Sequence, residues 1–100
     1  MARFEKLNAE KLLGNVPEQY VFYVHDGRIL RNIHDLKSAL ENMPDETYAY
    51  HANEQKNDFS NWIKNIIGDE KLARDLRRAT NRTQAAKSVA TRELFLSGKS

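Results

Sequence analysis

The clearest signal in the chain is the recurrence of apolar residues every three or four positions. Residues 33–43 and 58–67 both carry such a stripe, and each stripe predicts a helix. The stripes consist of Ile33, Leu36, Leu40 and Met43, and of Phe59, Trp62, Ile63 and Ile66. Asn32, and either Asn57 or Asp58, can cap these two helices. Further helices are expected over residues 7–14, with Asn8 as N-cap, and over residues 70–80, with Asp69 as N-cap.

Two other segments have the composition of β-strands. Residues 19–31 contain an aromatic and β-branched run, then Asp26-Gly27, then a second apolar pair. Because Asp-Gly suits a type I′ turn, this segment predicts a β-hairpin. Residues 46–52, ETYAYHA, predict a third strand. The expected fold is therefore α+β, with a small antiparallel sheet of about three strands packed by three to four helices.

The apolar pattern weakens near residue 80. Thr83 can cap a last helix that continues to Leu96, but the apolar side of that helix is mostly alanine. We therefore expect residues 1–80 to form the α+β domain. Residues 81–100 are expected to form a basic C-terminal tail, either helical or flexible.

Composition narrows the class of protein. Hydrophobic residues make up 40% and charged residues 30% of the 100 residues, which is typical of one folded domain. The chain has no cysteine, so disulfides and thiolate metal sites are excluded. No apolar run approaches the ~18 residues of a membrane span, and the first residues do not resemble a signal peptide. We expect a cytoplasmic protein.

The net charge of +2 is distributed unevenly. Residues 1–70 contain eight basic and twelve acidic residues, whereas residues 71–100 contain eight basic and two acidic ones. Six cations fall within nineteen residues: Arg74, Arg77, Arg78, Arg82, Lys87 and Arg92. Arginine and lysine bind backbone phosphates without any sequence motif. The sequence therefore predicts binding to nucleic acid or to a ribonucleoprotein, although a solvated surface would have the same composition.

Two alternatives concern the same end of the chain. The isolated apolar run Leu94, Phe95 and Leu96 would suit a protein partner or a second copy of the chain. Two helical pieces around residues 79–82 also suit a helix-turn-helix, although the usual glycine is missing from the joint.

Catalytic and metal-binding patterns are weak. His25 and His51 lie in predicted strands and could form a site with Asp26 or Asp58, but their spacing matches no metal signature. Asp58 and Asp69 lie at helix starts, where carboxylates cap free amides. Tyr48 and Tyr50 would be stacking residues if they lie on an open sheet face. We expect no enzymatic activity, no metal and no cofactor.

One resemblance covers roughly residues 20–78. The segments FYVHDGRILRNIHDLKSALENM and TYAYHANEQKNDFSNWIKNIIGDEKLARDLRR resemble a small prokaryotic domain family of unknown function. The matching motifs are the turn at residues 26–28, the helix at residues 32–40 and the blocks at residues 58–63 and 68–73. The resemblance implies a recurring bacterial and archaeal module, but it implies no activity and leaves the basic tail unmatched.

Overall fold

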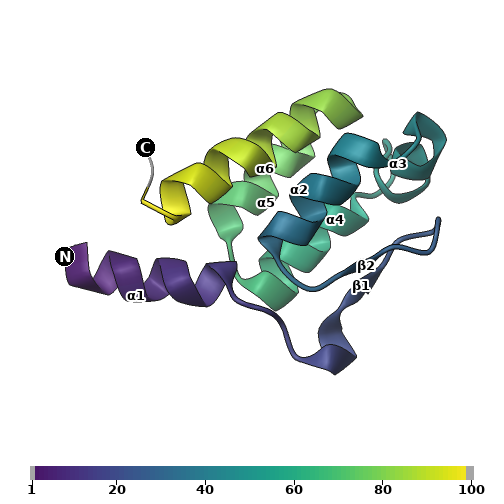
Figure 1. Ribbon diagram of the computed structural model, residues 1–100. Helices are drawn as coiled ribbons and strands as arrows, with labels where there is room; N and C mark the ends of the chain where they lie inside the picture. Colours follow the sequence, from purple (N-terminus) through teal and green to yellow (C-terminus); the bar gives the residue numbers. More distant parts are fainter. Residues whose placement is uncertain (1, 99–100) are drawn as a thin grey trace.

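The computed structural model describes the backbone of residues 2–98 and the side chains of residues 8–98. Within this part of the chain, six α-helices and a two-stranded sheet follow one another (Figure 1). The helices are α1 (Ala2–Leu13), α2 (Ile33–Asn42), α3 (Asp45–His51), α4 (Asp58–Trp62), α5 (Glu70–Arg78) and α6 (Arg82–Leu96). The strands β1 (Phe22–Tyr23) and β2 (Ile29–Leu30) follow the 3-10 turn η1 (Glu18–Tyr20), and the π-helix η2 (Ile63–Ile67) continues α4.

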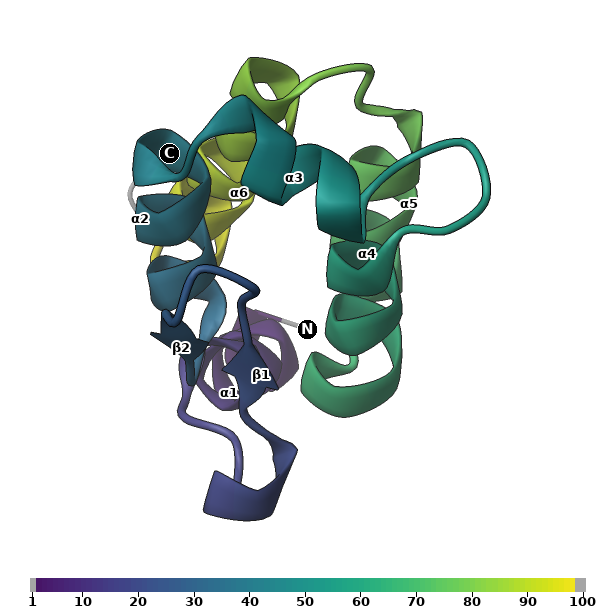
Figure 2. The ribbon, with the colours of Figure 1, turned by 90° about the vertical axis from the view of Figure 1, so that its right-hand side faces the viewer.

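The helices enclose one core. In Figure 2, α2 and α6 lie on one side, α4 and α5 lie on the other, and α3 spans the top between them. Leu36, Leu40, Phe59 and Leu72 are fully or almost fully buried in the core. The stripes of α2 and α4 therefore face the core, as their spacing predicts. No helix in the described part of the chain is long and apolar enough to cross a membrane.

The hairpin exists, but its turn differs from the prediction. Phe22 pairs with Leu30 and Tyr23 with Ile29 in an antiparallel ladder. The Gly27 amide donates to the Val24 carbonyl at 2.9 Å, and Gly27 alone in the loop has a positive φ, of 100°. A type I′ turn needs positive φ at both central residues, so the expected turn type is wrong. The turn is instead formed by residues 24–27, and the positive φ of Gly27 at its end directs the chain back toward β2.

The expected third strand at residues 46–52 is wrong, because this segment forms α3. Thr47, Tyr48 and His51 are its buried residues, at a helical spacing. Pro44 precedes the helix, and two acidic residues occupy its first turn. Both features are signals of a helix start, whereas the aromatic residues of the segment favour a strand. The sheet therefore has two strands, and the fold is a mostly helical variant of the expected α+β class.

Most helix caps agree with the sequence. Asn32, Asn57 and Asp69 each accept a hydrogen bond from a backbone amide in the first turn of α2, α4 and α5. Asn81, rather than the expected Thr83, caps α6. Asn8 lies inside α1 and is not its N-cap, because the helix begins at Ala2, five residues before the predicted segment of residues 7–14.

The last helix belongs to the core, so the description of residues 81–100 as a tail is wrong for α6. Ala85 and Val89 are 1% and 0% exposed, and α6 packs against α2, α5 and α1. Figure 1 shows α6 lying alongside α2. Alanine adds little apolar area, but it lets two helices approach closely, and this contact supplies the burial.

Candidate functional site

Three of the six predicted phosphate-binding cations donate hydrogen bonds within the molecule: the partly buried Arg82 and Arg92, and Arg77, which is itself exposed. The Arg82 Nε donates to Asp45 Oδ1 at 2.8 Å, and its Nη1 donates to the Leu40 carbonyl at 2.7 Å. The Arg77 Nη1 donates to the Oγ of the buried Ser60 at 3.1 Å. These guanidinium groups hold α6 and α5 to their neighbours.

Arg92 is the third engaged cation. Its Nε donates to Asp69 Oδ2 at 2.8 Å and its Nη2 donates to Asp69 Oδ1 at 3.2 Å. The Asp69 side chain is 1% exposed and also accepts from the Leu72 amide at 3.1 Å. This paired geometry satisfies a buried carboxylate and joins the middle of α6 to the first turn of α5.

The other three cations face solvent. Arg74, Arg78 and Lys87 are exposed, and none forms an ion pair or side-chain hydrogen bond with the described residues. Arg74 and Arg78 lie four residues apart on α5, so both project from the same side of the helix. These three are the candidate residues available to an anionic partner.

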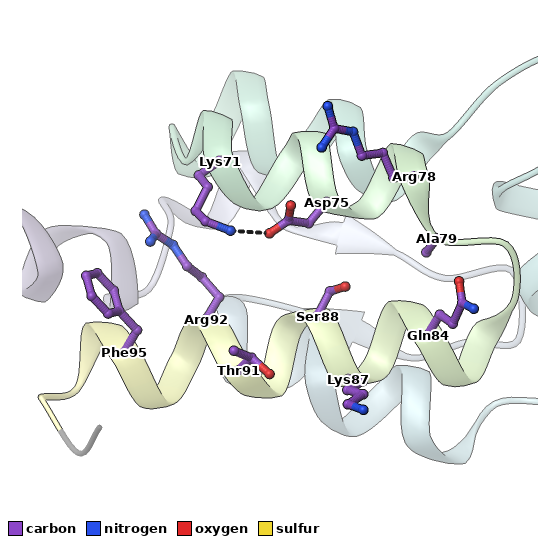
Figure 3. A pocket seen from close by; sticks show the side chains of 10 residues that line it. All are labelled: Lys71, Asp75, Arg78, Ala79, Gln84, Lys87, Ser88, Thr91, Arg92 and Phe95. Atoms are coloured by element: carbon purple, nitrogen blue, oxygen red, sulfur yellow. Dashed lines mark hydrogen bonds and ion pairs between the residues drawn. The ribbon is translucent and has the colours of Figure 1, made fainter.

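A groove of about 680 Å³ lies between α5 and α6. Figure 3 shows the two helices side by side and running in opposite directions. The α6 wall is one helical stripe, formed by Gln84, Lys87, Ser88, Thr91, Arg92 and Phe95. The α5 wall is formed by Lys71, Asp75 and Arg78, with Ala79 at the closed end where the chain passes to α6.

The groove has an excess of positive charge. Its walls carry four basic side chains and one acidic one. Lys71 pairs with Asp75 at 2.6 Å, and Arg92 is neutralised by Asp69 beneath the wall. Arg78 and Lys87 therefore provide the uncompensated charge. Ser88 and Thr91 add hydroxyl groups between these cations.

The predicted apolar patch does not form one surface. Leu96 is 9% exposed and lies in the core, so its side chain is not on the surface where a partner contact was expected. Leu94 and Phe95 are 54% and 63% exposed. Phe95 lines the groove between α5 and α6, whereas Leu94 lines a different hollow that includes Leu13 of α1. Consecutive helical residues point about 100° apart, which separates the two side chains.

His51 and Asp58 meet, as one of the considered pairings anticipated. The His51 Nδ1 lies 3.1 Å from Asp58 Oδ2, and the His25 amide donates to His51 Nε2 at 2.9 Å. Burial raises the pKa of Asp58, but hydrogen bonds from His51 and Lys56 and the positive charge of Lys56 outweigh it and hold the pKa below its ordinary value. With both ring nitrogens occupied, His51 joins α3 to α4 and to the hairpin.

The aromatic side chains divide between core and surface. Trp62 is buried, and its Nε1 donates to the Tyr20 carbonyl at 2.8 Å. Tyr48 is buried as well, and burial raises its pKa, so it is not a stacking residue on an open face. Tyr50 is 51% exposed, but its ring already stacks on His25 with centroids 4.0 Å apart. Among the residues that the structure describes, no three side chains of His, Asp or Glu form a metal-binding group.

The helix-turn-helix alternative is wrong. The helices of that motif meet at a steep angle, whereas α5 and α6 run side by side in opposite directions (Figure 3). Sequence reasoning named Phe95, Arg78, Lys87 and Arg92, but not their common groove. The spacing of Gln84, Ser88, Thr91 and Phe95 was a signal that could have identified it.

Comparisons with models of protein families, with curated proteins and with solved structures found no match for this chain. The resemblance of residues 20–78 to a small prokaryotic domain therefore stays a prediction. The candidate site rests on its own geometry.

Proposed function

We propose that this protein binds the sugar–phosphate backbone of a nucleic acid, free or within a ribonucleoprotein, through exposed cations of α5 and α6. The observation that carries the proposal is the contrast among its arginines. Arg82 and Arg92 are partly buried and held by acceptors on other parts of the fold, and the exposed Arg77 donates one bond to Ser60. Arg74, Arg78 and Lys87 project into solvent without an acceptor in the described part of the chain. An array of phosphates would supply those acceptors.

The groove chemistry favours this proposal over a protein-docking patch. Hydroxyl and amide groups of the α6 wall are the uncharged groups that commonly contact phosphates and sugars. The alternative partner surface at residues 94–96 loses Leu96 to the core, and its two exposed members face different hollows.

The proposal is for a binding protein rather than an enzyme, in the cytoplasmic location that the sequence favours. A general base needs a nitrogen or oxygen free to accept a proton from a substrate. His51 is the buried histidine beside a carboxylate, and its Nε2 already accepts the His25 amide. This pair therefore supports the fold rather than a reaction.

The proposal is tested by replacing Arg74 and Arg78 together with Ala. Fluorescence anisotropy with labelled DNA and RNA should show weaker binding to every sequence alike, because phosphate contacts carry no base information. Losing two contacts should also flatten the dependence of log affinity on log salt by about one to two units.

A matched control removes two exposed positive charges elsewhere, Lys11 on α1 and Arg31 before α2. This double alanine variant changes the net charge equally but should retain most of the affinity. Equal losses in the two variants would contradict a localised site and would indicate only a general effect of charge.

A further inference from the structure

Phe95 is an exposed aromatic ring at one end of the groove between α5 and α6, and Arg78 and Lys87 lie toward the other end (Figure 3). We infer that this groove binds a single strand, with one base stacked on Phe95 and phosphates farther along the strand at Arg78 and Lys87. This inference rests on the proposed function and adds the kind of nucleic acid that the site selects.

The first argument is the state of the Phe95 ring. The ring is 63% exposed at the open end of the groove, where an apolar side chain gains nothing from burial. The Arg92 guanidinium carbon lies over the Phe95 ring, 5.2 Å from the ring centroid. A flat base can cover exposed ring surface, because every base has a π-face.

The second argument is rigidity. Arg92 is fixed by two hydrogen bonds to the buried Asp69, at 2.8 and 3.2 Å. The cation beside Phe95 is therefore held in place before any ligand arrives, and little conformational entropy is lost on binding. Figure 3 shows Arg92 and Phe95 projecting together from α6 toward α5.

The third argument is access to the bases. Stacking on Phe95 needs a base whose flat face is free, and the bases of a duplex are already stacked on one another inside the helix. A single strand offers free base faces, and single-strand sites commonly combine a basic groove with aromatic stacking residues. Arg78 and Lys87 supply the charge, and Ser88 and Thr91 supply hydroxyl groups on the α6 side of the groove.

The experiment compares Phe95→Ala with wild type on labelled oligo(dT), oligo(U) and a duplex of matched length. Losing one stacked base should weaken single-strand binding about 5- to 150-fold. The salt dependence should stay unchanged, because no phosphate contact is lost. Duplex binding should change less than twofold. Phe95→Tyr keeps a ring of the same shape and should retain single-strand affinity within about threefold.

The matched control is Leu94→Ala, which removes another exposed apolar side chain from the adjacent position. It should leave single-strand affinity unchanged. Equal affinities of wild type and Phe95→Ala for single strands, or equal losses on single strand and duplex, would overturn the inference while leaving the proposed function intact. Wild type that binds neither substrate at low salt would overturn both.

Discussion

At the scale of single residues, the arginines of this chain occupy two kinds of surroundings that charge counting cannot separate. Arg82 and Arg92 donate to acceptors on other helices at hydrogen-bond distance, whereas Arg74 and Arg78 have no such partner in the described part of the chain. A planar guanidinium suits both roles, since it can donate to a fixed carboxylate or to a phosphate. The two groups should therefore respond differently to mutation.

Arg92→Ala should lower the free energy of unfolding by about 3 kcal/mol, because it leaves the buried Asp69 carboxylate without its counter-ion. The matched variant Arg74→Ala should change stability by no more than about 0.5 kcal/mol, as surface substitutions usually do. Urea unfolding followed by circular dichroism measures both. Equal stabilities of the two variants would show that the Asp69 pair contributes little.

Asp58 should make stability depend on pH. Its folded-state pKa lies below the ordinary value of 3.8, so the unfolded state takes up the proton more readily. The stabilisation is therefore present above about pH 4 and is lost as the pH falls through the lower, folded-state pKa.

Asp58→Asn removes this titration. The stability difference between wild type and Asp58→Asn, measured by urea unfolding, should be present at about pH 5 and should shrink toward about pH 2. A difference that stays constant over this range would contradict the assigned role of the carboxylate.

At the scale of elements, local signals transfer from sequence to structure better than tertiary ones. The caps Asn32, Asn57 and Asp69 are predictable because each side chain bonds an amide three residues away. The strand prediction for residues 46–52 failed because an aromatic residue can be buried in either kind of element. Tyr48 is buried against Phe59 of α4 and the core, not in a sheet.

The last helix misleads for a different reason. Its buried face includes Ala85 and Ala86, which look shallow in a sequence but form a close helix contact in the fold. The groove could not be predicted from the sequence either, because it depends on how α5 packs against α6. The cations and Phe95 could be named from the sequence, but the sequence does not show which arginines form hydrogen bonds within the fold.

Truncation after Thr80 should therefore abolish cooperative thermal unfolding, which reverses the expectation from the sequence. The truncation removes the fully buried Val89 and the buried Leu96, and it exposes the face of α2 on which α6 packs. Circular dichroism melts of the truncated and full chains measure the effect. A sharp transition in the truncated chain would show that residues 1–80 are an independent domain.

At the scale of the whole molecule, most of the positive charge of the C-terminal part of the sequence lies on α5 and α6. Residues 71–100 carry eight basic and two acidic residues, and four of the basic side chains line the groove between α5 and α6. The remainder of the chain carries more acid than base, which would disfavour contact with phosphates elsewhere. The molecule should therefore bind an anionic strand on this side.

The most direct test is the salt dependence of wild-type binding to single-stranded oligonucleotides. Three phosphate contacts, at Arg74, Arg78 and Lys87, should give a slope of log affinity against log salt of about −2 to −3. A slope near −4 or steeper would mean that engaged arginines also take part. No binding at low ionic strength, or binding that salt does not weaken, would contradict the proposal that this protein binds nucleic acid.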